Sequence, residues 1–226
     1  MIGNLKGDLN SDVREDGLIQ TYNDYPTAGM LVCVSGPSGV GKGTVIDALK
    51  ELMPDLAHSI SVTTRSPRGQ EVDGVDYFFR TKEEFALMIE NNQILEHDVY
   101  GGNFYGTPRD EIEKQVSAGK DIVMDVTVPG SLSILFRYEA ACNIFLLPPS
   151  LSELEKRLRD RGTETEESIQ FRLNKAIDEI KMASKFDYIL INKDLRQTAE
   201  EIRHIIIAEK LRVARRPGIE NIVLNK

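Results

Sequence analysis

Short apolar runs alternate along this chain with longer stretches in which apolar residues recur every three or four positions. The runs at 30–34, 121–125, 142–147 and 188–191 are typical of buried parallel strands, because helices cover both faces of such a sheet. The longer stretches between them predict helices. The pattern therefore predicts an α/β fold, a parallel sheet with helices on both faces, and ligand sites at the carboxyl ends of its strands.

Two sections break this alternation. A predicted strand at 58–64 leads into the section 62–107, where short β-like pieces flank a helix that starts at the capping pattern Thr81-x-x-Glu84. The second section, 151–172, is polar and rich in arginine. Both would be inserts over the carboxyl edge of the sheet, where ligands bind.

Length and composition indicate one globular domain. Of the 226 residues, 41% are hydrophobic, which is enough to bury a full core. Residues 1–27 are polar and acidic, so we expect a poorly ordered extension followed by a domain over 28–226. The net charge of −8 disfavours nucleic acid as a partner. Because the chain also lacks an apolar membrane span and an apolar signal core, we expect a cytoplasmic protein with no membrane partner.

Cysteine and histidine do not indicate a metal centre. Cys33 and Cys142 both fall within predicted strands, which favours small buried side chains over a disulfide or a metal pair. The histidines lack ligand-like spacing, so we expect no metal site built by the protein alone.

A glycine-rich loop with a lysine lies between the first predicted strand and a predicted helix. Its residues are Gly36, Pro37, Ser38, Gly39, Val40, Gly41, Lys42, Gly43 and Thr44. Glycines let phosphate oxygens approach backbone N–H groups, the helix N-terminus adds partial positive charge, and Lys42 can neutralise the outer phosphates. The alternative is a glycine-rich turn with a chance lysine, which the strand and helix context disfavours. The loop predicts binding of a nucleoside triphosphate.

The two inserts carry motifs that closely resemble those of guanylate kinases. These are Ser61 to Gly69, Glu71 to Tyr77, Ile94 to Glu96, Gly102 to Thr107, Pro148 to Ser150 and Arg157 to Ile169. The resemblance extends from about Leu31 to Leu211. It implies the P-loop nucleoside monophosphate kinase fold, with a GMP-binding insert at 62–107 and a lid at 151–172. It also implies ATP-dependent phosphorylation of GMP, and of dGMP, to GDP, with Mg²⁺ as the cofactor of ATP. The oligomeric state is left open between a monomer and a homodimer.

The resemblance assigns the acceptor phosphate of GMP to Arg65, Arg68, Tyr77 and Tyr105. Two arginines three positions apart can grip a phosphate with their forked donors, and the tyrosines add hydroxyl groups. Without the resemblance, such residues would more often form a solvated surface.

The resemblance assigns the guanine base to Glu96, with Ser61 and Thr107 at the guanine edge. A carboxylate can accept hydrogen bonds from N1–H and the 2-amino group together, and adenine lacks this donor pair. A lone glutamate after Ile-Leu would otherwise be the polar face of a strand, so its role rests on the resemblance.

Three arginines are candidates for the transfer step together with Lys42. Arg157, Arg161 and Arg172 would surround the γ-phosphate, because phosphoryl transfer needs positive charge there and little covalent help. The alternative is that they form ion pairs with Glu153 and Glu164 along a helix.

Further residues would contact the adenine or the metal. Arg161 and Asn192 match family positions beside the adenine. Asp125 ends a predicted strand beside the P-loop, where it can hold Mg²⁺ through water, although such an aspartate is otherwise often a helix cap. Gly43 stands where many P-loops place the metal-binding hydroxyl, so Thr44 is a further candidate.

The segment after Asp125 departs from the family pattern. Guanylate kinases usually read Asp-x-Asp/Glu-x-Gln-Gly there, whereas this chain has Thr127 and Pro129 in place of the second acid and the glutamine. We hypothesise weaker GMP binding or a loosened guanine preference. Two alternatives remain: a P-loop kinase for another phosphorylated acceptor, such as a ribose phosphate, and a kinase-like scaffold that binds a protein in the old cleft. The retained Lys42 and the arginines disfavour the scaffold.

Overall fold

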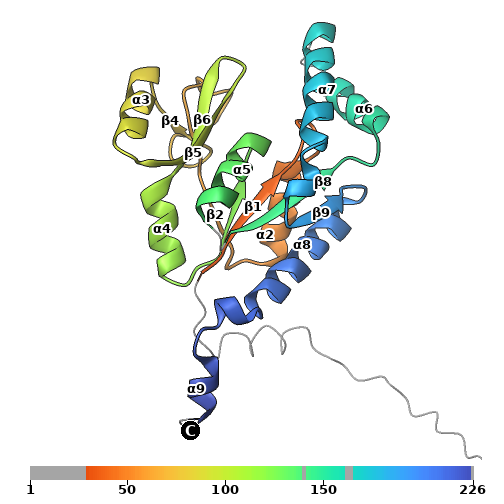
Figure 1. The fold of residues 1–226 in the computed structure, drawn as a ribbon. Coiled ribbons are helices and arrows are strands. Elements are labelled where there is room, and N and C mark those ends of the chain that lie inside the picture. Colours follow the sequence, from red (N-terminus) through yellow and green to blue (C-terminus); the bar gives the residue numbers. More distant parts are fainter. Residues whose placement is uncertain (1–28, 139–140, 161–164, 225–226) are drawn as a thin grey trace, which may run out of the picture.

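The computed structural model describes residues 29–138, 141–160 and 165–224 (Figure 1). The extension expected over 1–27 and the candidate Arg161 lie outside the described residues.

The centre of the domain is a parallel sheet with the strand order β2-β7-β1-β8-β9. Its strands are β1 (Leu31–Ser35), β2 (Ala57–His58), β7 (Ile122–Asp125), β8 (Cys142–Leu147) and β9 (Tyr188–Ile191). Strand β1 pairs in parallel with both β7 and β8, so it lies in the middle. The predicted α/β fold with a parallel sheet is confirmed, and each of the four apolar runs forms one of its strands.

Helices cover both faces of this sheet (Figure 1). On one face, α2 (Lys42–Leu52) and α8 (Leu195–Lys210) pack on Val32 and Val34 of β1. On the other face, α4 (Arg109–Ser117) and α5 (Val128–Arg137) pack on Leu31 and Cys33. Neighbouring side chains of β1 thus point to opposite faces of the sheet. Because helices cover both faces, β1 is apolar from Leu31 to Val34.

The two cysteines are buried thiols, as predicted. Cys33 belongs to the apolar cluster on one face of the central sheet, and Cys142 belongs to the cluster on the other face. Burial raises the pKa of both thiols, which keeps them protonated and unreactive.

A second sheet has the strand order β4-β3-β6-β5. Its strands are β3 (Val62–Thr63), β4 (Phe78–Phe79), β5 (Ile94–Tyr100) and β6 (Asn103–Pro108). Helix α3 (Lys82–Glu90) covers it through Phe85, which is buried against Val62 and Ile94. The helix begins at the predicted capping box of Thr81 and Glu84.

The single strand predicted over 58–64 is wrong. Ala57–His58 pairs with β7 in the central sheet, whereas Val62–Thr63 pairs with β4 and β6 in the second sheet. The sequence shows no break between residues 58 and 64, but the strand that this segment hydrogen-bonds to changes from β7 to β4 and β6. Residues 59–61 therefore link the two sheets.

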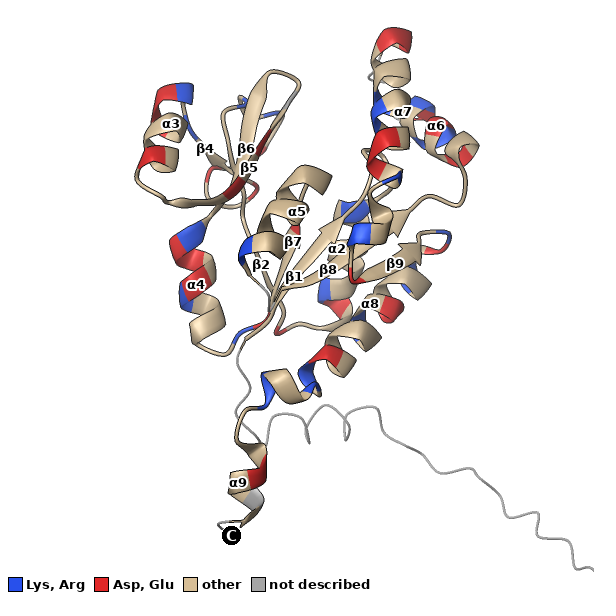
Figure 2. Cartoon of the chain, in the orientation of Figure 1, with Lys and Arg blue, Asp and Glu red and all other residues tan. Residues whose placement is uncertain are grey.

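The helices α6 (Leu151–Asp160) and α7 (Glu166–Ile180) form a third packed unit around Leu154, Leu158 and Ile169. This pair and the second sheet lie on opposite sides of the same end of the central sheet (Figure 1). Acidic and basic residues are interspersed along both helices (Figure 2). The last described helix is the short α9 (Ile219–Leu224). None of the described helices combines the length and the apolar character needed to cross a membrane.

Candidate active site

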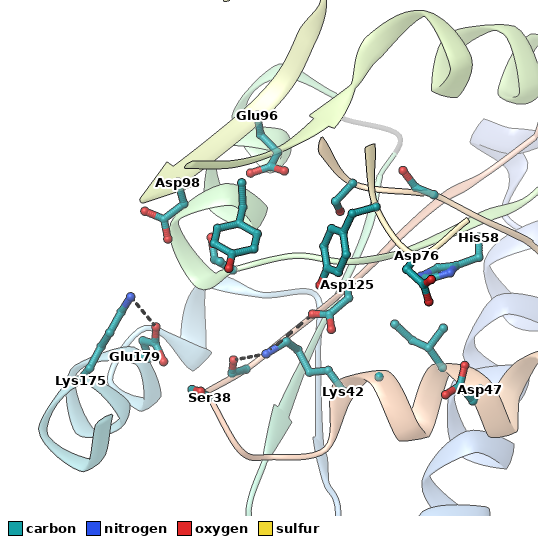
Figure 3. Close-up of a pocket in the computed structure, with 18 residues that line it drawn as sticks. Ser38, Lys42, Asp47, His58, Asp76, Glu96, Asp98, Asp125, Lys175 and Glu179 are labelled. Carbon is teal, nitrogen blue, oxygen red and sulfur yellow. Dashed lines mark hydrogen bonds and ion pairs between the residues drawn. The ribbon is translucent and has the colours of Figure 1, made fainter. Parts of the chain in front are cut away.

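A cleft of about 450 Å³ lies between the P-loop, the second sheet and α7 (Figure 3). It opens where β1 and β7 end, as the α/β topology predicts. The candidate residues that line it are Gly36, Ser38, Lys42, Gly43, Ser61, Tyr77, Glu96, Tyr105 and Asp125.

Two glycines allow the P-loop to turn tightly between β1 and α2. A Cβ atom on Gly36 would lie 2.4 Å from the carbonyl oxygen of Leu146, so a larger residue would clash. Gly41 is the N-cap of α2 with φ of 100°, a left-handed conformation that glycine adopts without strain. No described side chain caps α2, so its first N–H groups are available for an anion.

Lys42 extends from the first turn of α2 into the cleft. Its Nζ donates a 3.0 Å hydrogen bond to the carbonyl oxygen of Gly36 and lies 3.8 Å from Oδ1 of Asp125. Desolvation by the surrounding protein raises the pKa of Asp125, although 43% of its side chain stays exposed. The positive charge of Lys42 lowers that pKa in part. The two side chains place opposite charges side by side at the P-loop.

His58 is a cleft residue that sequence reasoning missed. It ends β2, which pairs with β7 so that His58 lies opposite Val123, near Asp125. Burial and then the charge of Lys50 lower its pKa, while Asp125 and Asp47 raise it in part. Its position depends on strand pairing, so no local motif could have revealed it.

Glu96 lies at the far end of the cleft from the P-loop helix, with only 7% of its surface exposed. The Thr107 hydroxyl donates a 2.7 Å hydrogen bond to its Oε1. Burial raises the pKa of Glu96 to about 7, and the Thr107 hydrogen bond lowers it in part. The structure thus brings Glu96 and Thr107 together, and Ser61 lines the same cleft.

Gly130 contacts the Glu96 carboxylate from α5. A Cβ atom at this position would lie 2.2 Å from Oε2 of Glu96 and 3.0 Å from Cγ1 of Val126. A larger residue would therefore force the carboxylate or α5 to move. Sequence reasoning did not identify this close approach, since the two residues lie on elements that meet only in the folded chain.

The unusual segment after Asp125 forms the start of α5. Thr127 is its N-cap, and its hydroxyl accepts a 3.2 Å hydrogen bond from the Gly130 N–H. Pro129 lies in the first helical turn, where its missing N–H costs no hydrogen bond. Thr127 also lines the cleft, so the residue that replaces an acid faces the site.

The acceptor-phosphate candidates form a cluster at the second sheet. The guanidinium of Arg65 makes two 2.9 Å hydrogen bonds to Glu71 and lies 5.3 Å from the centre of the Tyr77 ring. Tyr77 and Tyr105 meet edge to face, with ring centres 6.3 Å apart. Glu71 also accepts a 2.7 Å hydrogen bond from the backbone of Arg68, whose side chain is exposed. Glu71 therefore orients Arg65 and its loop.

Arg157 reaches from α6 to the back of the P-loop. Its Nη1 donates to the carbonyl oxygen of Val40 and its Nη2 to that of Asn192, both at 3.1 Å. Its Nε makes the ion pair with Glu153 that was the alternative prediction, also at 3.1 Å. Both interactions thus occur together, and Arg157 joins α6 to the nucleotide loop.

Asn192 is buried beneath the P-loop. Its Nδ2 donates a 2.8 Å hydrogen bond to the carbonyl oxygen of Val40, and its Oδ1 accepts from Thr198. The structure thus gives Asn192 a role in holding the loop, and its contact with adenine stays a prediction.

The remaining candidates are spread around the cleft. The guanidinium of Arg172 lies 3.5 Å from the Ser38 hydroxyl, so α7 also approaches the P-loop. Thr44 is exposed and is not among the residues that line the cleft. Among the described residues, no group of three His, Cys, Asp or Glu side chains could hold a metal ion.

Comparisons with known proteins agree on one family. The family model described as guanylate kinase matches residues 28–209. A guanylate kinase of Desulfitobacterium hafniense is 42% identical over 191 residues, which cover 84% of this chain and 96% of the relative. A guanylate kinase of Halalkalibacterium halodurans is 46% identical over 181 residues, which cover 80% of this chain and 89% of the relative.

A solved structure agrees with these sequences. The crystal structure of guanylate kinase from Anaplasma phagocytophilum superposes with a TM-score of 0.74 at 33% identity. The match covers 87% of this chain and 94% of the relative. The similarity therefore includes the second sheet and the helices around the cleft, as well as the P-loop.

Proposed function

This chain belongs to the guanylate kinase family, and on that premise we propose how its cleft serves the reaction. The protein catalyses ATP-dependent phosphorylation of GMP to GDP. One observation carries the assignment to this site: a single cleft joins the P-loop Lys42 to the buried Glu96 (Figure 3). A donor phosphate and a guanine acceptor can therefore face each other within it.

The P-loop side of the cleft would bind ATP. The N–H groups at the start of α2 and the ammonium of Lys42 provide positive charge for the phosphates. Arg157 and Arg172 already contact this loop, and their guanidinium groups would turn toward the γ-phosphate when α6 and α7 close over the cleft. Their charge would stabilise the transition state, which spreads negative charge over the transferred group.

The second sheet would bind GMP. Glu96 would accept hydrogen bonds from N1–H and the 2-amino group of guanine, with Thr107 and Ser61 beside the base. Arg65, with Tyr77 and Tyr105, would hold the phosphate. Since these groups recognise the base and the phosphate, dGMP would be a substrate as well.

The reaction would proceed by in-line transfer between the two bound nucleotides. The acceptor phosphate is already an oxyanion, so the protein needs no general base. Its work is to hold the two phosphates in line, to stabilise their charge and to exclude water as α6 and α7 close over the cleft.

The cleft also fits the Mg²⁺ that accompanies ATP. Asp125 presents a carboxylate beside Lys42, and oxygen donors are those that Mg²⁺ prefers. We propose that Asp125 would hold the ion through water. The ion would neutralise charge on the ATP oxygens during transfer.

A coupled assay of diphosphate formation tests the function directly. The purified protein is given ATP and Mg²⁺ with GMP, dGMP, AMP, UMP or ribose 1,5-bisphosphate as the acceptor. We expect turnover with GMP and dGMP, and loss of that turnover in Lys42→Met at an unchanged melting temperature. Turnover with another acceptor alone would mean that Thr127 and Pro129 have redirected the site. No turnover with any acceptor, despite ATP binding, would support a binding scaffold.

A further inference from the structure

Asp98 is a charged cleft residue that the proposed reaction does not use. It follows Glu96 by two positions on β5, and both residues line the cleft. Its Oδ1 accepts a 2.7 Å hydrogen bond from the Val99 N–H. Its Oδ2 is buried and has no hydrogen-bond partner among the described residues. A carboxylate oxygen in this state is costly, and it favours any donor that can approach.

The opposite wall of the cleft carries such a donor. Lys175 and Glu179 lie one turn apart on α7, with Nζ of Lys175 3.8 Å from Oε1 of Glu179. Both residues line the cleft, and Figure 3 shows them projecting from α7 on the side that faces Asp98.

The charges of the two walls already influence each other. Burial raises the pKa of Glu179, Lys175 and Lys42 lower it in part, and the negative charge of Asp98 raises it again. Asp98 and Glu179 thus repel each other across the cleft. Closure would increase this repulsion unless a cation lay between the two acids.

We propose that Asp98 and Lys175 are positioning residues that form an ion pair across the cleft when both nucleotides are bound. The proposal rests on the function proposed above. An ammonium on a four-carbon stem has three donors, so Lys175 can reach Asp98 and keep its contact with Glu179. Arg172 lies three residues before Lys175 on the same side of α7, so this pair would also draw Arg172 toward the transferred phosphate.

A double-mutant cycle tests the pair. The variants Asp98→Asn, Lys175→Met and the double variant are compared with the parent protein for kcat/KM with GMP at saturating ATP. We expect each single variant to lose about five- to tenfold, and the double variant to lose no more than either, because contacting residues are not additive. A coupling of threefold or more supports the proposal. Losses that multiply in the double variant overturn it.

The melting temperature provides the readout that separates closure from simple stability. The four proteins are measured alone and with GMP plus a non-hydrolysable ATP analogue. We expect the two substitutions to be coupled only with both nucleotides present. Coupling of equal size without nucleotides would mean a constant structural contact and would overturn the proposal. This readout needs no turnover, so it stands apart from a failure of the proposed reaction.

A second ion pair, between the last turn of α7 and its C-cap residue, gives a matched control. Nζ of Lys181 lies 2.8 Å from Oδ1 of Asp178, and both side chains are exposed and outside the cleft. The cycle of Asp178→Asn and Lys181→Met should show no coupling in kcat/KM and no dependence on nucleotides. If this control pair behaved like Asp98 and Lys175, the effect would belong to the charge of α7 in general, and the proposal would be wrong.

Discussion

The Thr107 hydroxyl donates a 2.7 Å hydrogen bond to Oε1 of Glu96, across two neighbouring antiparallel strands. The bond occupies one oxygen of a carboxylate that is otherwise buried. It therefore orients Glu96 before any ligand arrives, and it supplies part of the compensation for burying the charge. The pairing of β5 with β6 therefore sets the position of the carboxylate that we propose for guanine recognition.

Replacing Glu96 by glutamine should raise the KM for GMP by about 10- to 100-fold. The amide would present a donor to one of the two guanine donors, and a hydrogen bond to a charged group contributes about 1.5–3 kcal/mol. Steady-state kinetics with GMP and with ATP as the varied substrate checks this, and the KM for ATP should stay unchanged. An unaltered KM for GMP would remove Glu96 from base recognition.

The pH dependence of GMP use should follow Glu96. Burial raises the pKa of Glu96 to about 7, so the free protein is protonated there at lower pH, whereas guanine requires the carboxylate. We expect kcat/KM for GMP to fall by about tenfold per pH unit below that value. The free energy of unfolding should also fall as the pH rises from the pKa of Glu96 in the unfolded chain to about 7. The reason is that the folded state binds this proton more tightly than the unfolded state does.

The control for this pH profile is Glu96→Gln, because the GMP phosphate itself titrates near pH 6. The component of the profile that persists in the variant belongs to the phosphate and to other groups. A profile identical in the two proteins would show that Glu96 does not titrate in this range.

Alanine at position 130 should impair GMP binding from a distance. Its Cβ atom would lie 2.2 Å from Oε2 of Glu96, so either the carboxylate or α5 must move. Overpacking of this kind costs about 1–3 kcal/mol, and we expect a lower melting temperature and a KM for GMP raised by at least tenfold. The KM for ATP should change little, since the P-loop lies elsewhere. Unchanged GMP kinetics in Gly130→Ala would mean that the carboxylate tolerates the shift.

Aspartate at position 127 should strengthen GMP binding. Asp is as good an N-cap as Thr, so α5 keeps its start, and the new carboxylate faces the cleft. We expect a lower KM for GMP and a sharper preference for GMP over AMP in Thr127→Asp. If neither quantity moves, the absence of the second acid has no consequence in this chain.

Thr127→Ala is the matched variant that separates the capping of α5 by residue 127 from its contribution to GMP binding in the cleft. It removes the cap without adding charge, and we expect it to lower stability by about 1 kcal/mol. Denaturant unfolding measures this loss. A variant as stable as the parent would contradict the capping role of Thr127.

Much of the site could be predicted from contiguous residues. The apolar runs predicted the central strands, and the glycine loop with Lys42 predicted the P-loop, because backbone geometry and hydrophobic periodicity are local properties. The capping box of Thr81 was equally local. The resemblance added the proposed role of Glu96 in guanine recognition, which its place in an apolar run could not have indicated.

What the sequence by itself determined was the succession of strands and helices and the chemistry available at the phosphate loop. Only the tertiary structure decided which strand pairs with which, so it divided the 58–64 segment between two sheets and placed His58 in the cleft. It also placed Gly130 against Glu96 and Asp98 opposite Lys175. These contacts join residues far apart in the chain. They depend on how helices and strands pack against one another, and that packing cannot be derived from local sequence patterns.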